Sequence, residues 1–92
     1  DGAWAWDRTV VDWQGNEVVI HHEQEALRLD RLVHRRDTGE WWVLDHKSEW
    51  RPELKPGLQD KMNNYRAAVQ AAYPQAVVRA AYLTAQGKLV NV

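Results

Sequence analysis

Two carboxylates and one ammonium group in this sequence are spaced so that they can share a site. Asp45 and Lys47 lie two residues apart in 41–48, a run of aromatic and aliphatic residues that predicts a β-strand. Successive side chains of a strand point to opposite faces, so residues two apart point to the same face. Asp30 lies in 27–35, which we expect to form the preceding strand. All three side chains belong to one patch if these two strands pair.

The turn between these strands determines which of their residues face each other. Residues 37–40 include a glycine and predict a four-residue hairpin loop. If the residues on either side of this loop pair, Asp30 lies opposite Lys47 and diagonal to Asp45. Diagonal neighbours on one face of an antiparallel sheet are about 7–8 Å apart or less. We therefore expect both carboxylates on one face, partly buried by the apolar residues around them.

The chemistry of such a trio depends on its oxygen ligands and its cation. Paired carboxylates suit Mg²⁺ or Mn²⁺ better than zinc. A lysine beside the metal can orient an attacking water or balance negative charge in a phosphoryl transition state. Asp30, Asp45 and Lys47 therefore predict hydrolysis of a phosphodiester bond. The alternative is an ordinary solvated ion pair between Asp45 and Lys47, since Asp-x-Lys is a common tripeptide.

The hydrophobic pattern predicts the elements that must position these residues. Apolar residues recur at steps of four and three over 58–72, which indicates one amphipathic helix of about four turns. The predicted strands are residues 9–13, 17–22, 27–35, 41–48, 77–84 and 88–92. We expect a turn at 14–16, and 1–16 as a whole to form an irregular lead-in or a short edge strand. Antiparallel strands, one helix and two further strands predict an α+β domain with a mixed sheet.

Length and composition narrow the possibilities further. The 92 residues are enough for one domain, and 45% of them are apolar. Without cysteine, the chain has no disulfide, thiolate zinc site or cysteine-ligated iron–sulfur cluster. No apolar run reaches the length of a membrane span, and a net charge of −1 excludes a polybasic tail. Because Met62 is the only methionine, we expect a processed chain or part of a longer one.

Three segments resemble a known nuclease family. The first, LRLDRLVHRRDTGEWWVLDHKS, is similar to the second and third catalytic motifs of the PD-(D/E)XK nuclease superfamily. Within that superfamily it resembles the RecB-like nuclease domain at the C-terminus of UvrD/AddA-type (exodeoxyribonuclease V beta-like) DNA helicases. The segments KMNNYRAAV and VVRAAYLTAQGKLVNV are similar to the helix and the closing strand pair of that domain. The resemblance covers about residues 17–92.

The resemblance implies a restriction-endonuclease-like core and a set of site residues. It implies that Asp30, Asp45 and the backbone carbonyl of His46 hold Mg²⁺ or Mn²⁺, and that Lys47 positions the attacking water. The residues expected to support the site or bind DNA are Lys61, Tyr65 and Arg66. His34, which shares the parity of Asp30 along its strand, is a further candidate for contact with DNA.

The resemblance also implies a biological setting. A domain of this family hydrolyses DNA as part of a larger helicase–exonuclease that processes broken DNA ends in recombination and repair. Its partners would be DNA, the helicase domains of the same full-length chain and possible partner subunits, in the cytoplasm and away from membranes. No ATP-binding G-x-x-x-x-G-K-[ST] motif occurs in this sequence, so ATP binding would belong to other parts of the full-length protein.

Two departures from the family pattern leave an alternative open. The family has glutamine where this chain has Lys61, and it carries an acid or histidine on a helix before the first strand. No sufficiently long helical pattern precedes Thr9, so we expect that leading helix to be missing from this chain. The alternative is a catalytically incomplete nuclease-fold module that binds DNA or protein. A third possibility is an unrelated small α+β binding domain.

Overall fold

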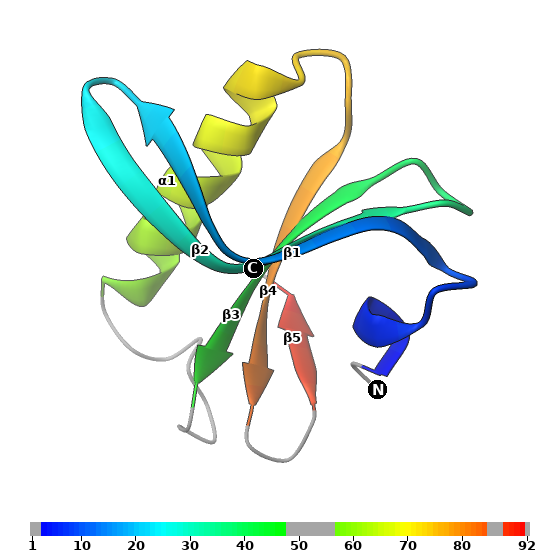
Figure 1. Cartoon of the computed structure of the whole chain (residues 1–92). Helices are drawn as coiled ribbons and strands as arrows, with labels where there is room; N and C mark the ends of the chain where they lie inside the picture. Colours follow the sequence, from blue (N-terminus) through cyan, green and yellow to red (C-terminus); the bar gives the residue numbers. More distant parts are fainter. Residues whose placement is uncertain (1–2, 48–56, 85–87, 92) are drawn as a thin grey trace.

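The computed structural model describes residues 3–47, 57–84 and 88–91 as a mixed five-stranded sheet with one α-helix (Figure 1). The elements are the 3₁₀ helix η1 (Ala3–Trp6), the strands β1 (Val11–His22), β2 (Glu25–Arg35) and β3 (Trp41–Lys47), the helix α1 (Leu58–Ala72), and the strands β4 (Val78–Thr84) and β5 (Leu89–Asn91). This architecture confirms the predicted α+β class with a mixed sheet. Pro52, Pro56 and Gly57 predict that 49–57 has no regular structure, and all of this segment except Gly57 lies outside the described residues.

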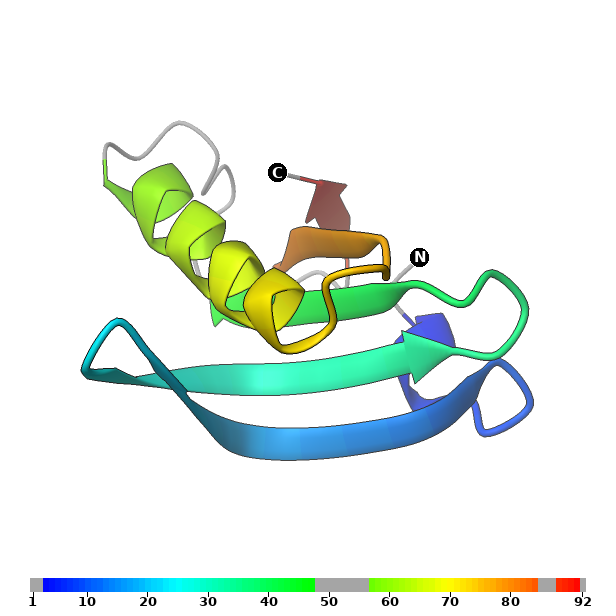
Figure 2. The same ribbon diagram turned by 90° about the horizontal axis from the view of Figure 1, so that it is seen from above.

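The strands lie side by side in chain order, β1-β2-β3-β4-β5. Neighbouring strands are antiparallel except for β3 and β4, which are parallel. Parallel neighbours need a crossover connection, and α1 lies in that connection. Viewed from above, α1 lies along one side of the sheet (Figure 2). The carboxyl ends of β3 and β4 therefore meet at one edge of the sheet.

The helix has the predicted bounds, and it covers one face of the sheet. Met62, Tyr65 and Val69, at the predicted spacing, are buried against the strands. Gly57 precedes the helix with a φ of 86°, a backbone conformation that suits glycine. On the opposite face, Ala5 of η1 packs into a second apolar cluster with Val11, Val33, Trp42, Leu44, Ala81 and Leu83. In the described residues, no helix is long and apolar enough to cross a membrane.

The first strand is longer than predicted. The turn expected at 14–16 is wrong, and the edge strand expected within 1–16 is longer than predicted. β1 is an edge strand that continues from Val11 to His22, and Asn16 pairs with Arg31 of β2. Gly15 is required for close packing, since a Cβ there would lie 2.8 Å from Val18 Cγ2. A glycine that reads as a turn signal thus serves a close approach within a strand.

Tight turns set both hairpin registers. Glu23 and Gln24 have φ values of 49° and 67°, and positive values at both central residues are typical of a type I′ turn. His22 therefore pairs with Glu25, and β2 begins two residues earlier than predicted.

The loop between β2 and β3 is shifted by one residue from the prediction. Arg35 donates its N–H to the Glu40 carbonyl at 2.8 Å, so residues 36–39 form the loop. His34 then pairs with Trp41, and continuing this register brings Asp30 opposite Asp45. The expected pairing of Asp30 with Lys47 is therefore wrong by two residues. Because the register between β2 and β3 shifts by two residues, every side chain of this hairpin keeps its predicted face.

Candidate functional site

The structure brings Asp30, Asp45 and Lys47 together at the carboxyl end of β3. Asp30 Oδ2 accepts a hydrogen bond of 2.9 Å from the backbone N–H of His46. The Asp30 and Asp45 carboxyl groups are within hydrogen-bonding contact of each other. Lys47 Nζ lies 2.9 Å from Asp45 Oδ2. The predicted trio is thus a single cluster that spans β2 and β3.

The two carboxyl groups titrate in opposite directions. Asp45 is only 3% exposed, and its pKa is raised by burial and by the neighbouring Asp30, while Lys47 opposes the rise. Burial also acts to raise the pKa of half-buried Asp30, but hydrogen bonds from Asp45 and from the His46 N–H outweigh it, so the pKa falls. Of the two carboxyl groups, Asp45 therefore holds its proton to the higher pH.

β4 contributes two side chains that the sequence did not indicate. Parallel pairing places Tyr82 beside Asp45, and Thr84 beside Lys47. Tyr82 is fully buried, and its pKa is raised by burial and by Asp45. No local signal could have found these residues, because the register of β4 against β3 is set through the α1 crossover rather than through a turn.

The donor set fits a hard divalent cation. Mg²⁺ typically takes one or two protein carboxylates and completes its octahedron with water and substrate oxygens. Asp30 and Asp45 converge as two such carboxylates, and the carbonyl of His46 remains a predicted third ligand. No group of three or more acidic or histidine side chains within 3–47, 57–84 and 88–91 is arranged to hold a metal. The described residues would therefore supply only part of a coordination sphere.

The predicted supporting residues on α1 differ in their surroundings. Tyr65 is 8% exposed and packs in the core between α1 and the sheet. Lys61 is exposed, with its Nζ 5.5 Å from the centre of the Tyr65 ring. Arg66 donates a hydrogen bond of 2.8 Å from Nη2 to Asn63 Oδ1.

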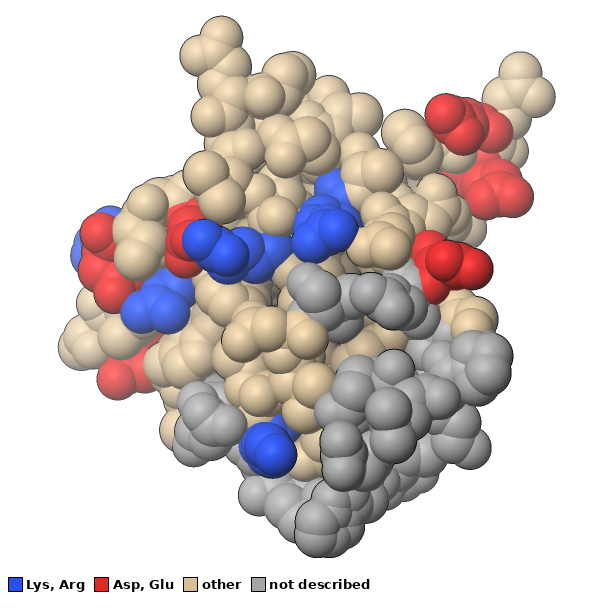
Figure 3. Space-filling model, turned by 180° about the vertical axis from the view of Figure 1, so that it is seen from behind, with Lys and Arg blue, Asp and Glu red and all other residues tan. Residues whose placement is uncertain are grey.

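Seen from behind, the molecule shows basic groups across its middle and acidic groups toward its two sides (Figure 3).

His34 lies away from the carboxylates, at the other end of β2. Four strand residues separate it from Asp30, or about 13 Å. Its Nδ1 is 2.6 Å from Asp12 Oδ1, and its ring centre lies 4.8 Å from that of Trp41. The Trp41 ring stacks on Tyr73, with centres 4.5 Å apart. His34 therefore belongs to an aromatic group rather than to the carboxylate cluster.

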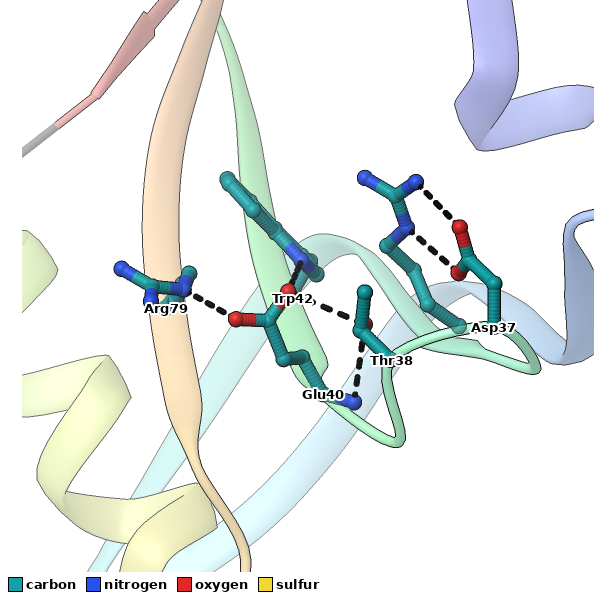
Figure 4. Close-up of polar contacts among 6 residues, drawn as sticks. Asp37, Thr38, Glu40, Trp42 and Arg79 are labelled. Atoms are coloured by element: carbon teal, nitrogen blue, oxygen red, sulfur yellow. Dashed lines mark hydrogen bonds and ion pairs between the residues drawn. The ribbon is translucent and has the colours of Figure 1, made fainter.

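A second polar cluster lies near His34, where the loop enters β3. Glu40 accepts hydrogen bonds from Arg79 of β4, from the Trp42 indole at 3.2 Å and from the Thr38 hydroxyl at 3.0 Å (Figure 4). These partners lower the pKa of Glu40, with Arg79 as the largest cause. Every partner of this carboxylate is a donor, so the cluster suits a structural role that ties the hairpin loop to β4.

Comparisons with known proteins do not assign a family. No protein-family model matches the chain. The curated proteins contain no match either.

Proposed function

We propose that this chain is a metal-dependent DNA nuclease module that hydrolyses phosphodiester bonds. The observation that carries the proposal is the convergence of Asp30, Asp45 and Lys47 in one largely buried cluster. A solvated ion pair, the ordinary alternative, would leave Asp45 exposed and away from a second acid. A 3%-exposed carboxyl beside another carboxyl is costly for folding, and such arrangements are typical of functional sites.

Each residue has a role that follows from its position. Asp30 and Asp45 offer oxygen ligands to Mg²⁺ or Mn²⁺, which when bound would polarise the scissile phosphate. Lys47 holds a cation beside Asp45, where it can orient water and balance charge on the phosphoryl group. The water gives up one proton to solvent, and its oxygen bonds to phosphorus as the P–O bond to the leaving oxygen breaks. The leaving oxygen takes up a proton, and the products are a phosphate monoester and an alcohol.

The topology supports the same proposal. An antiparallel β1-β2-β3 meander, a crossover helix and a parallel β4 follow the order expected of a restriction-endonuclease-like core. In open α/β sheets, ligands commonly bind beyond the carboxyl ends of parallel strands. The Asp45–Lys47 segment ends β3 at that edge. The wider setting remains part of the proposal: a RecB-like domain of a cytoplasmic helicase–nuclease that acts on DNA ends.

One observation favours a second candidate function. Within the described residues, only two acidic side chains converge on the site, so a metal would lack a third side-chain ligand there. This is the arrangement expected of a catalytically incomplete module that binds DNA or protein within a larger helicase.

Metal titration and cleavage together separate the two functions. The proposal predicts Mn²⁺ binding by calorimetry and Mg²⁺-dependent degradation of single-stranded DNA, and both should be lost in Asp30→Asn. DNA binding without cleavage, in a folded protein and at saturating metal, would support the binding module. Absence of metal binding would contradict the nuclease.

A further inference from the structure

Tyr82 presents a buried hydroxyl group next to the carboxylate cluster. It lies on β4 directly beside Asp45 of β3, and paired residues of neighbouring strands share a face. Its ring is fully buried in the core beneath α1, with Met62 and Tyr65 in the same apolar cluster. Among the described residues, its hydroxyl has no hydrogen-bond partner. A phenylalanine would fill the same core, so packing alone does not explain the hydroxyl.

Asp45 has a matching unsatisfied atom. Its Oδ2 is buried and accepts no hydrogen bond from the described residues, although Lys47 Nζ is within ion-pair distance at 2.9 Å. Buried polar groups in native proteins are nearly always paired. Here one donor and one acceptor are unsatisfied on two residues that are neighbours in the sheet. A small group that accepts from Tyr82 and donates to Asp45 would satisfy both.

A water molecule is the species whose chemistry fits this pair. It has two O–H donors and two lone pairs, whereas a phosphate oxygen only accepts and would be repelled by the Asp45 carboxylate. A water that accepts from Tyr82 Oη and donates to Asp45 Oδ2 has one lone pair and one O–H left. Its neighbour is the Lys47 ammonium group.

We propose that Tyr82 positions the attacking water of this site by donating a hydrogen bond to it, while Asp45 Oδ2 accepts a hydrogen bond from the same water. The inference rests on the proposed nuclease function and adds to it a residue that neither the motifs nor the resemblance indicates. Two fixed hydrogen bonds give the remaining lone pair of the water a fixed direction, and this is the lone pair that would attack the phosphorus. Orientation of this kind acts on the chemical step and not on the affinity for DNA.

Tyr82→Phe removes only the hydroxyl, and Tyr73→Phe is its matched control. Tyr73 is exposed at the C-terminal end of α1, away from the cluster. We expect Tyr82→Phe to lower kcat for Mg²⁺-dependent cleavage of single-stranded DNA by about 10–100-fold. Its KM should match the wild-type value, and its urea unfolding midpoint should stay at or above that of the wild type. Tyr73→Phe should match the wild type throughout.

Three outcomes would overturn the assignment. If the wild type cleaves and Tyr82→Phe cleaves equally well, Tyr82 has no part in the reaction although the proposed function stands. If the unfolding midpoint falls and activity falls only in proportion to the folded fraction, the hydroxyl is structural. If the wild type neither binds Mn²⁺ nor cleaves, the proposed function fails, and this inference fails with it.

Discussion

Glu40 immediately precedes β3 and Asp45 lies near its carboxyl end, and their surroundings have opposite effects on their charge. Glu40 is surrounded by donors, and its pKa is lowered. Asp45 faces a second acid, is almost completely buried, and has a raised pKa. The folded protein therefore stabilises the charge of one carboxylate and penalises that of the other. The segment 40–47 thus has a structural end, where donors satisfy Glu40, and a candidate reactive end, where Asp45 is buried beside a second acid.

The largest effect should come from Lys47, the cation at the reactive end. Lys47→Ala should lower the rate of Mg²⁺-dependent DNA cleavage by at least about 100-fold, because a charge beside the reacting phosphate is lost. Initial rates on labelled single-stranded DNA measure this. Arg28→Ala is the control, since Arg28 forms an exposed pair with Glu17 on β1. Cleavage by Lys47→Ala at the wild-type rate would end the distinction between the two ends of β3.

At the structural end, Glu40→Gln should destabilise the fold by about 1–2 kcal/mol. The amide cannot replace the charge-assisted hydrogen bond from Arg79, and its NH₂ group presents a donor where donors already converge. Urea unfolding measures the change. The control is Glu17→Gln, which removes a glutamate whose exposed side chain pairs with the exposed Arg28 between β1 and β2. Exposed pairs contribute little, so we expect less than about 0.5 kcal/mol there. Equal losses in both variants would show that Glu40 is an ordinary surface residue.

At the reactive end, removal of the carboxylate charge should change the free energy of unfolding in the opposite direction. Asp45→Asn should stabilise the fold by about 1 kcal/mol, because a buried negative charge beside Asp30 is replaced by a neutral amide that can donate to it. The same variant should lose cleavage. Asp37→Asn is the control, since Asp37 pairs with Arg35 and its pKa is lowered, so it should not gain stability. A loss of stability in Asp45→Asn would mean that the ion pair with Lys47 outweighs the repulsion.

How much of this could be predicted from the sequence depends on the range of each interaction. The grouping of Asp30 with Asp45 was predictable, because side-chain parity survives a register shift of two residues. The helix was predictable because its apolar residues recur at helical spacing. These inferences need only local pattern and one short turn.

Contacts between residues far apart in the sequence could not be predicted from local pattern. Gln14, Gly15 and Asn16 carry every local sign of a turn, yet they pair with β2 because Gly15 allows close packing and Asn16 bonds the buried Arg31. The position of Tyr82 beside Asp45 depends on the register of parallel strands, which are joined through a helix. Glu40 looks like a loop residue until Arg79, 39 positions later, is placed next to it.

The pH dependence of the free energy of unfolding should also distinguish Glu40 from Asp45. We expect this effect to be the smallest of the four. The folded-state pKa of Glu40 lies below its ordinary value of 4.5, so its contribution is present above that pH and is lost as the pH falls through the folded pKa. The folded-state pKa of Asp45 lies above its ordinary value of 3.8, so the folded state binds that proton more tightly. Stability from this group is therefore present at low pH and is lost as the pH rises above 3.8.

Urea unfolding of the wild type, Glu40→Gln and Asp45→Asn across the acidic range measures the pH dependence that each carboxylate contributes. The advantage of the wild type over Glu40→Gln should grow with rising pH, while its disadvantage against Asp45→Asn should grow as well. Parallel pH profiles for all three proteins would mean that the two ends of β3 do not differ electrostatically.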